Sequence, residues 1–314
     1  MADALYGPYG FYRSTGAPAR NFRTSAHTSL AWAAAIGRLL DRADAALGHP
    51  ADFTVVDLGA GGGELVAALA ADAPQRWTLI GVDVAPRPAT LSDRVGWREA
   101  PPDAFEGALV AVEWLDVVPV DVVELTEHGP RLVEVDGAGH ERLGGEPSAT
   151  DLDWLAQWWP LREVGDRAEL GRSRDEAWAD MQALLRRGLA VAIDYAADPR
   201  RDIAGTLTGY AAGRQVVPVP DGSMDLTAHV LFESLRTGDA EVRMLTQRDA
   251  LRALGVSGAR PPYEGDAAAY VAALSQAGAE AELLARGGLG DHRWLLAQRD
   301  MSPAMIELDV DEET

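Results

Sequence analysis

The chain has 314 residues, 47% of them hydrophobic and 25% charged, a composition typical of a globular protein with a substantial core. It contains no cysteine, and all 28 of its basic residues are arginine. These absences exclude thiolate nucleophiles, cysteine zinc sites, Schiff-base catalysis and the lysine-dependent Walker A loop. The formal net charge of −21 argues against a nucleic-acid partner, which needs a basic surface.

The predicted elements alternate between helices and short apolar strands, which indicates a mostly parallel α/β sheet. A glycine- and aromatic-rich opening precedes a helical pattern over Thr28–Ala46, and the stretch Gly63–Ala71 predicts the helix after the first strand. Helices are also predicted over Thr246–Leu254 and Asp266–Leu284. Strands are predicted at Thr54–Leu58, Thr78–Val84, Ala108–Glu113, Leu189–Tyr195, Glu241–Leu245 and Arg293–Ala297.

Two stretches interrupt this alternation. The first, Pro119–Gly145, predicts a β-hairpin, followed by a Trp-bearing helix near Asp151–Trp159 and another over about Arg174–Arg187. The second, Ala196–Arg236, is rich in Gly and Pro and predicts a loop-and-helix excursion. We therefore expect a helical N-terminal arm (1–48), a main α/β domain (49–300) with insertions at about 117–187 and 197–238, and an acidic tail (301–314).

No apolar run reaches membrane length, and the first twenty residues lack the features of a secretory or organelle leader. We expect a cytoplasmic protein with no membrane insertion. The six histidines show no metal-ligand spacing, so no metal site is expected.

The most informative stretch is a strand, a glycine-rich turn and a helix, Thr54-Val-Val-Asp-Leu-Gly-Ala-Gly-Gly-Gly-Glu. A dinucleotide-binding turn would need its third glycine where Glu64 stands, and a carboxylate repels a pyrophosphate at that place. S-adenosylmethionine carries no phosphate, so the turn favours this cofactor. Its expected ligands are Asp57, at the end of the first strand, Asp83, after the next strand, and the three glycines that allow a close approach, Gly59, Gly61 and Gly63. A tight turn with an Asp cap is the structural alternative.

Further motifs along the chain are Gly10-Phe-Tyr, Asn21-Phe-Arg-Thr-Ser, Glu113-Trp-Leu-Asp-Val-Val-Pro, Ile193-Asp-Tyr, Gly205-Thr-Leu and Asp225-Leu-Thr-Ala-His-Val. With the glycine turn, and in this order from Gly10 to about Gln298, they resemble the MidA family of methyltransferases, called NDUFAF7 in mitochondria. The most distinctive is the Asp225 motif, close to the family's Asp-Ile-Thr-Ala-His-Val.

The resemblance implies a Rossmann-like class I methyltransferase fold with insertions after the fourth and fifth strands. For the mitochondrial members it implies symmetric dimethylation of an arginine in a subunit of respiratory complex I. The chain departs from the family motifs at Val112 (Asn in the family), Ala196 (Gly) and Arg20-Asn21 (Gly-Asp). These departures leave the cofactor prediction intact and bear on the acceptor.

An arginine acceptor is permanently charged, so carboxylates must orient its guanidinium and help remove a proton as the methyl group is transferred. The candidates are Glu113, which is also expected near the cofactor, Asp116 and Asp194, with His229 as a proton acceptor. Each has a structural alternative: Asp116 as a turn cap, Asp194 closing a loop, and His229 as a core residue on a helix. Asp225 is expected to cap the segment that follows it.

Arginines 172, 174, 186 and 187 are expected on a solvated face, and the clustered tryptophans 154, 158 and 159 in a core. Two other functions stay open: a non-catalytic assembly or docking factor that keeps the fold, and an NAD-dependent oxidoreductase, which Glu64 disfavours. The sequence leaves the oligomeric state open.

Overall fold

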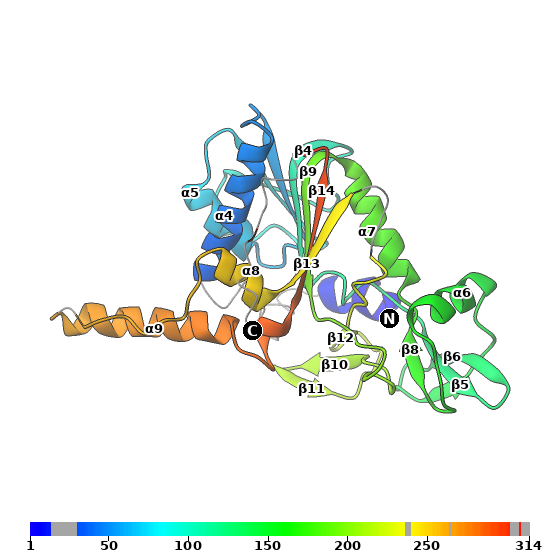
Figure 1. Cartoon of the computed structure of the whole chain (residues 1–314). Coiled ribbons are helices and arrows are strands. Elements are labelled where there is room, and N and C mark those ends of the chain that lie inside the picture. The colour runs from blue at the N-terminus through cyan, green and yellow to red at the C-terminus, as the bar shows by residue number, and fades with distance from the viewer. Residues whose placement is uncertain (14–29, 236–239, 264, 302–307, 309–314) are drawn as a thin grey trace. The chain divides into compact units, whose positions relative to one another are not determined.

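The fold is taken from a computed structural model that describes residues 1–13, 30–235, 240–263, 265–301 and 308 (Figure 1). The chain divides into two compact units. The insert unit takes the described residues of Met1–Phe22, Trp114–Met181 and Asp194–Gly238, and the sheet unit takes those of Arg23–Glu113, Gln182–Ile193 and Asp239–Thr314. Within the described residues, every helix is too short or too polar to cross a membrane.

The sheet unit is built on seven strands in the order β13-β14-β9-β4-β1-β2-β3. Their bounds are β1 Phe53–Leu58, β2 Trp77–Val82, β3 Val95–Arg98, β4 Phe105–Val112, β9 Leu185–Asp194, β13 Glu241–Thr246 and β14 Arg293–Arg299. Strand β1 pairs in parallel with β2 and β4, and β13 pairs antiparallel with β14. All six residues of β1 are buried, as expected for an inner strand of a parallel sheet.

The helices of the sheet unit are α4 Leu30–Ala46, α5 Glu64–Asp72, α8 Gln247–Ala253, α9 Ala267–Leu283 and the short 3₁₀ helix η2 Leu289–Asp291. Figure 1 shows α4 and α5 on the same side of the sheet. Apolar residues at helical spacing along α4, among them Trp32, Ile36 and Leu40, join one core with Val55 and Leu79 of the strands.

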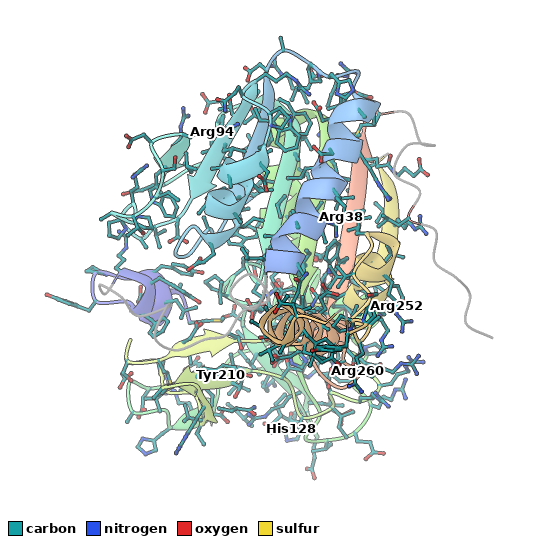
Figure 2. All side chains as sticks on the ribbon, turned by 90° about the vertical axis from the view of Figure 1, so that its left-hand side faces the viewer. Arg38, Arg94, His128, Tyr210, Arg252 and Arg260 are labelled. Carbon is teal, nitrogen blue, oxygen red and sulfur yellow. The ribbon has the colours of Figure 1, made fainter. Side chains whose placement is uncertain are left out.

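Arginine side chains fasten several turns of this unit through main-chain carbonyls. Arg94, labelled in Figure 2, donates to the carbonyl oxygens of Ala70, Ala73 and Pro74 at 2.6–2.7 Å, just where α5 ends. Arg38 of α4 donates to the carbonyl of Leu254 after α8 at 2.6 Å. These donors satisfy carbonyls that a helix end leaves unpaired.

The insert unit contains two small antiparallel sheets, ordered β7-β6-β5-β8 and β11-β10-β12. Its elements are α1 Ala2–Tyr6, η1 Phe11–Arg13, β5 Val122–Thr126, β6 Gly129–Val135, β7 Glu141–Leu143, α6 Ala149–Trp158, β8 Arg167–Glu169, β10 Thr208–Ala211, β11 Arg214–Val216 and β12 Asp225–Thr227. Helix α7 (Arg172–Leu184) begins in this unit, and its last three residues belong to the sheet unit.

The structure confirms the predicted α/β class, with the helical N-terminal arm and insertions after the fourth and fifth strands of the parallel sheet. Three local predictions need correction. The sequence pattern missed β3, and α7 ends at Leu184 because residues 185–187 begin β9. In the described part of residues 196–236 there is a three-stranded sheet and no helix, because Gly-rich turns pair short extended runs. The expected start of the first long helix at Thr28, the Asn21 motif and most of the acidic tail lie outside the described residues.

Candidate functional site

The turn that joins β1 to α5 is shaped by three glycines with positive φ, Gly59 (72°), Gly61 (55°) and Gly63 (78°). A Cβ added to Gly61 would meet no atom within 4 Å, whereas one on Gly63 would lie 3.2 Å from Leu91. Backbone of this kind favours glycine, because other residues rarely adopt positive φ. At Gly61 the main chain therefore borders open space that a ligand can approach closely.

Asp83 follows β2 directly and braces this turn. Its Oδ2 accepts a hydrogen bond from the N–H of Gly61 at 2.8 Å, and its Oδ1 accepts one from the N–H of Ala85 at 2.8 Å. Burial raises the pKa of Asp83, against the effect of these main-chain donors. Asp83 is half-buried, and its carboxylate holds the turn.

Asp57, at the end of β1, is 4% exposed. Burial raises its pKa from the ordinary 3.8 to about 8, and the negative charges of Glu64 and Asp83 act in the same direction. A buried carboxylate surrounded by acids gains most from a cation placed beside it. The acidic character of the turn suits a positively charged ligand without phosphate, and Glu64 at the start of α5 opposes a pyrophosphate there.

Glu113 follows β4 and adopts a left-handed conformation with φ 49°. Its N–H donates to the carbonyl oxygen of Ile193 in β9 at 2.8 Å, which continues the pairing of the two strands past the end of β4. A non-glycine residue with positive φ is strained, and such strain is concentrated at functional sites. The chain passes from the sheet unit to the insert unit directly after this residue.

Asp116 and Asp194 are brought together within the insert unit, and both are buried. The Oδ2 of Asp194 accepts from the N–H groups of Leu115 and Asp116 at 3.0 and 3.1 Å, and its Oδ1 accepts from the N–H of Tyr195 at 2.8 Å. Burial raises the pKa of Asp194, against these donors and the charge of Arg174. The carboxylate thus holds the turn that presents Asp116.

His229 also lies in the insert unit, two residues after β12, in a segment without regular secondary structure and not on the helix that the sequence predicted. Its ring stacks on that of Tyr195, with centroids 6.0 Å apart, and its buried Nδ1 has no hydrogen-bond partner in the described part of the chain. Burial lowers the pKa of the imidazole, against the charges of Asp202 and Glu169. A neutral imidazole with an unused nitrogen can accept a proton.

Asp225, the first residue of the motif that ends with His229, takes a tertiary role. Its Oδ2 accepts from the hydroxyl of Tyr12 at 2.8 Å, and its Oδ1 accepts from the N–H of Leu226 at 2.8 Å. Burial raises its pKa to about 6. Asp225 begins strand β12, so it does not cap a helical segment as expected, and its side chain binds the N-terminal segment through Tyr12.

Comparison with known proteins assigns the chain to a family. Residues 35–248, more than half of the chain, match the family model described as "Putative S-adenosyl-L-methionine-dependent methyltransferase". The chain belongs to this methyltransferase family. No curated protein matches the sequence.

Two crystal structures from Burkholderia thailandensis have the same fold. One, bound to S-adenosyl-homocysteine, is 25% identical, with a TM-score of 0.81 over 97% of this chain and 88% of that protein. The other, an uncharacterised member of the same superfamily, is also 25% identical, with a TM-score of 0.78 over 97% of this chain and 87% of that one.

The cofactor of the methyltransferase is S-adenosyl-L-methionine. The residues of the sheet unit fit it: the open backbone at Gly61 would admit a close ligand, and carboxylates such as those of Asp57 and Asp83 can bind ammonium groups and ribose hydroxyls. The acidic residues of the turn suit a ligand that, like this cofactor, carries no phosphate group.

The sequence pattern did not predict that one arginine is buried. Arg174 was expected on a solvated face, but it is 2% exposed and donates to the main-chain carbonyls of Asp116, Val118 and His229. Burial lowers the pKa of its guanidinium, against the charges of nearby carboxylates. Its neighbours in sequence are charged, so no local signal separates it from the exposed Arg186 and Arg187.

Proposed function

We propose that the methyltransferase transfers the methyl group of S-adenosyl-L-methionine to a side-chain nitrogen of arginine in another protein. The proposal rests on the strained conformation of Glu113, which directly follows β4. Strand β4 pairs with β1, the strand that leads into the glycine turn. A carboxylate at that place can orient a guanidinium through charge-assisted hydrogen bonds. The motif resemblance to the MidA family supports arginine as the acceptor and a subunit of respiratory complex I as the protein that carries it.

The proposed cofactor residues all belong to the sheet unit. The turn of Gly59, Gly61 and Gly63 receives the ligand, Asp57 attracts its ammonium group, and Asp83 accepts from the ribose hydroxyls. Glu113, at the end of the neighbouring strand, is proposed beside them. When bound, the cofactor supplies a methyl group activated by its positively charged sulfur.

On the acceptor side, the residues must orient a nitrogen for in-line attack and remove a proton. Glu113 and Asp116, which lies three positions later along the chain, are each proposed to bind the guanidinium. The nitrogen forms its bond to the methyl carbon as the carbon–sulfur bond breaks, and His229 accepts the proton that the nitrogen loses. Asp194, whose oxygens accept from three main-chain N–H groups, supports this chemistry by holding Asp116 in place.

The departures from the family motifs bear on the acceptor. Ala196, where the family has Gly, forms a parallel bridge to Val230, and the N–H of Ala197 donates to the Val230 carbonyl at 2.9 Å. Val112 is the last residue of β4, and Arg20-Asn21 lies outside the described residues. None of the three belongs to the glycine turn, so they bear on the acceptor side of the proposal and not on the cofactor.

The proposal is tested by tritium transfer from labelled cofactor into a lysate of cells that lack this gene. We expect one labelled protein, with the label in methylarginine after acid hydrolysis, and its identification tests the link to complex I. Label in another amino acid or in a small molecule would contradict the arginine acceptor. Binding of the cofactor without any transfer would contradict the enzymatic function and favour a docking factor. The cytoplasmic location and the absence of a nucleic-acid partner stay predictions.

A further inference from the structure

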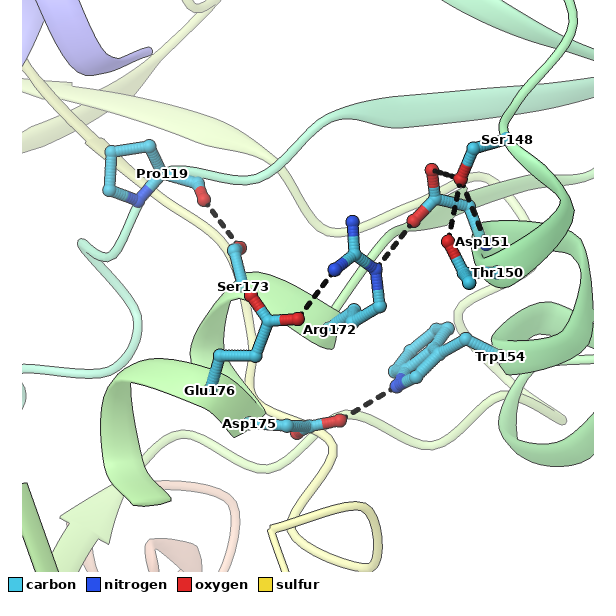
Figure 3. A network of polar contacts seen from close by, with 9 residues as sticks. All are labelled: Pro119, Ser148, Thr150, Asp151, Trp154, Arg172, Ser173, Asp175 and Glu176. Carbon is cyan, nitrogen blue, oxygen red and sulfur yellow. Dashed lines mark hydrogen bonds and ion pairs between the residues drawn. The ribbon is translucent and has the colours of Figure 1, made fainter. Parts of the chain in front are cut away.

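The first turn of α7 is fastened to two other parts of the insert unit. The indole N–H of Trp154 in α6 donates to Asp175 at 2.7 Å, and the hydroxyl of Ser173 donates to the carbonyl of Pro119 at 2.7 Å (Figure 3). The first turn of α7 is therefore bonded both to helix α6 and to the segment that follows β4.

Arg174 extends from the same turn into the interior. One terminal nitrogen donates to the carbonyl of His229 at 2.6 Å and the other to the carbonyl of Asp116 at 2.8 Å, while Nε reaches the carbonyl of Val118 at 3.4 Å. The Asp116 carbonyl also accepts from the N–H of Ala228 at 3.1 Å. A single guanidinium thus connects the two segments that carry Asp116 and His229.

Burying Arg174 in this way costs free energy of folding. A fully buried cation loses its hydration, and at the start of a helix it also opposes the helix dipole. Packed apolar residues usually stabilise an interior as well as a buried charge does. What an apolar residue cannot do is bind carbonyls of two segments at fixed directions, which the planar guanidinium with its five donors does.

Asp194 binds the same stretch of backbone as Arg174, but as a hydrogen-bond acceptor. Its carboxylate accepts from the N–H groups of Leu115 and Asp116, while Arg174 donates to the carbonyl of Asp116. Both the N–H and the carbonyl group of Asp116 are thereby held by buried side chains, and both charges lie within one unit of the chain. The backbone of Asp116 has little freedom to rotate.

We propose that Arg174 is a positioning residue of the methyltransferase, which fixes the backbone of Asp116 relative to that of His229 so that both side chains meet the acceptor in reactive geometry. This inference rests on the proposed function, in which these two residues act on the acceptor. In this role Arg174 acts through the backbones of Asp116 and His229 and not through contact with substrate or cofactor.

The test compares Arg174→Ala with Arg172→Ala. Arg172 lies two residues earlier on the same helix, but its side chain binds Asp151 and Glu176 instead of the two segments (Figure 3). Methyl transfer to the labelled acceptor is measured at saturating cofactor, with cofactor affinity from calorimetry and unfolding from circular dichroism. We expect Arg174→Ala to lower the rate by about 10- to 100-fold at unchanged cofactor affinity, and Arg172→Ala to retain the wild-type rate.

Chemical rescue separates positioning from stability. About 20 mM guanidinium chloride, far below denaturing concentrations of several molar, should raise the rate of Arg174→Ala by replacing the missing group, and should leave Arg172→Ala unaffected. Since guanidinium weakens folded proteins, a loss of rate caused by instability would not be rescued. Equal rates in the two alanine variants, or a loss of rate in Arg174→Ala without rescue, would overturn the proposal.

Two further measurements keep the proposal falsifiable. If Arg174→Ala does not fold, Arg174→Lys replaces it, because one ammonium cannot span both carbonyls; a wild-type rate in this variant would overturn the proposal. If the wild type binds the cofactor but transfers no methyl group, the proposed function fails by itself. The ¹⁵N resonances of the His229 ring then decide the positioning: a shift in the Arg174 variant relative to Arg172→Ala supports it, and identical resonances refute it.

Discussion

The buried carboxyl of Asp57 makes the stability of the protein depend on pH in a direction that can be worked out. Its pKa is raised from 3.8 in an ordinary setting to about 8 in the folded protein. Between these values the folded chain holds a proton that the unfolded chain releases, so stability falls as the pH rises. Each pH unit in this window is worth about 1.4 kcal/mol. From pH 5 to pH 8 this one group therefore removes about 4 kcal/mol of stability.

Asp57→Asn removes this titration and should flatten the dependence. Urea unfolding at pH 5, 6, 7 and 8 without cofactor is expected to show the wild type losing about 4 kcal/mol more than the variant over this range. Asp93→Asn, a change at an exposed carboxylate in the same unit, is the control and should follow the wild type. Parallel pH profiles for wild type and Asp57→Asn would refute the reasoning, because Asp57 would then be no more protonated in the folded protein than in the unfolded one.

The same carboxyl links pH to the cofactor. A cationic ligand beside Asp57 favours its ionised form, so binding should release a proton near pH 7. Calorimetry in buffers of different ionisation enthalpy measures this release. Asp57→Asn should abolish the release and weaken binding about tenfold or more, the usual effect of losing a charged hydrogen bond. Equal proton release by wild type and variant would remove Asp57 from the cofactor site.

Three further predictions concern single positions. Glu113→Gln should lower methyl transfer by about 100-fold or more while cofactor affinity stays nearly unchanged; full activity would remove Glu113 from the catalytic residues. Gly107→Ala should lower the free energy of unfolding by about 1–3 kcal/mol, because the new Cβ would lie 2.1 Å from a main-chain oxygen of β1; an unchanged urea midpoint would contradict this. Gln247→Leu should cost about 2–5 kcal/mol, since the indole N–H groups of Trp32 and Trp294 both donate to its side-chain oxygen, and a loss below about 1 kcal/mol would show that water replaces it.

Much of the fold follows from local patterns. The buried run of β1, the glycines after it and the helical spacing of α4 are all properties of short segments, and the structure contains these elements near the predicted bounds. Strand β3 was missed because Val95–Arg98 is only four residues long and has a single fully buried residue, too short a run to give a clear pattern. Its place in the sheet comes from pairing with β2, a contact between segments that no local pattern encodes.

The sequence by itself determined the glycine-rich turn between strand and helix and the positions of Asp57 and Asp83 after successive strands, and from these it predicted the kind of ligand that can approach. The tertiary structure decided which polar side chains are buried and already hydrogen-bonded within the protein. Asp194 is taken up by three main-chain N–H groups, and Arg174 lies in the interior and not on a solvated face. The physical reason is that burial and hydrogen bonding depend on partners distant in sequence, whereas backbone conformation at a glycine turn depends on neighbouring residues.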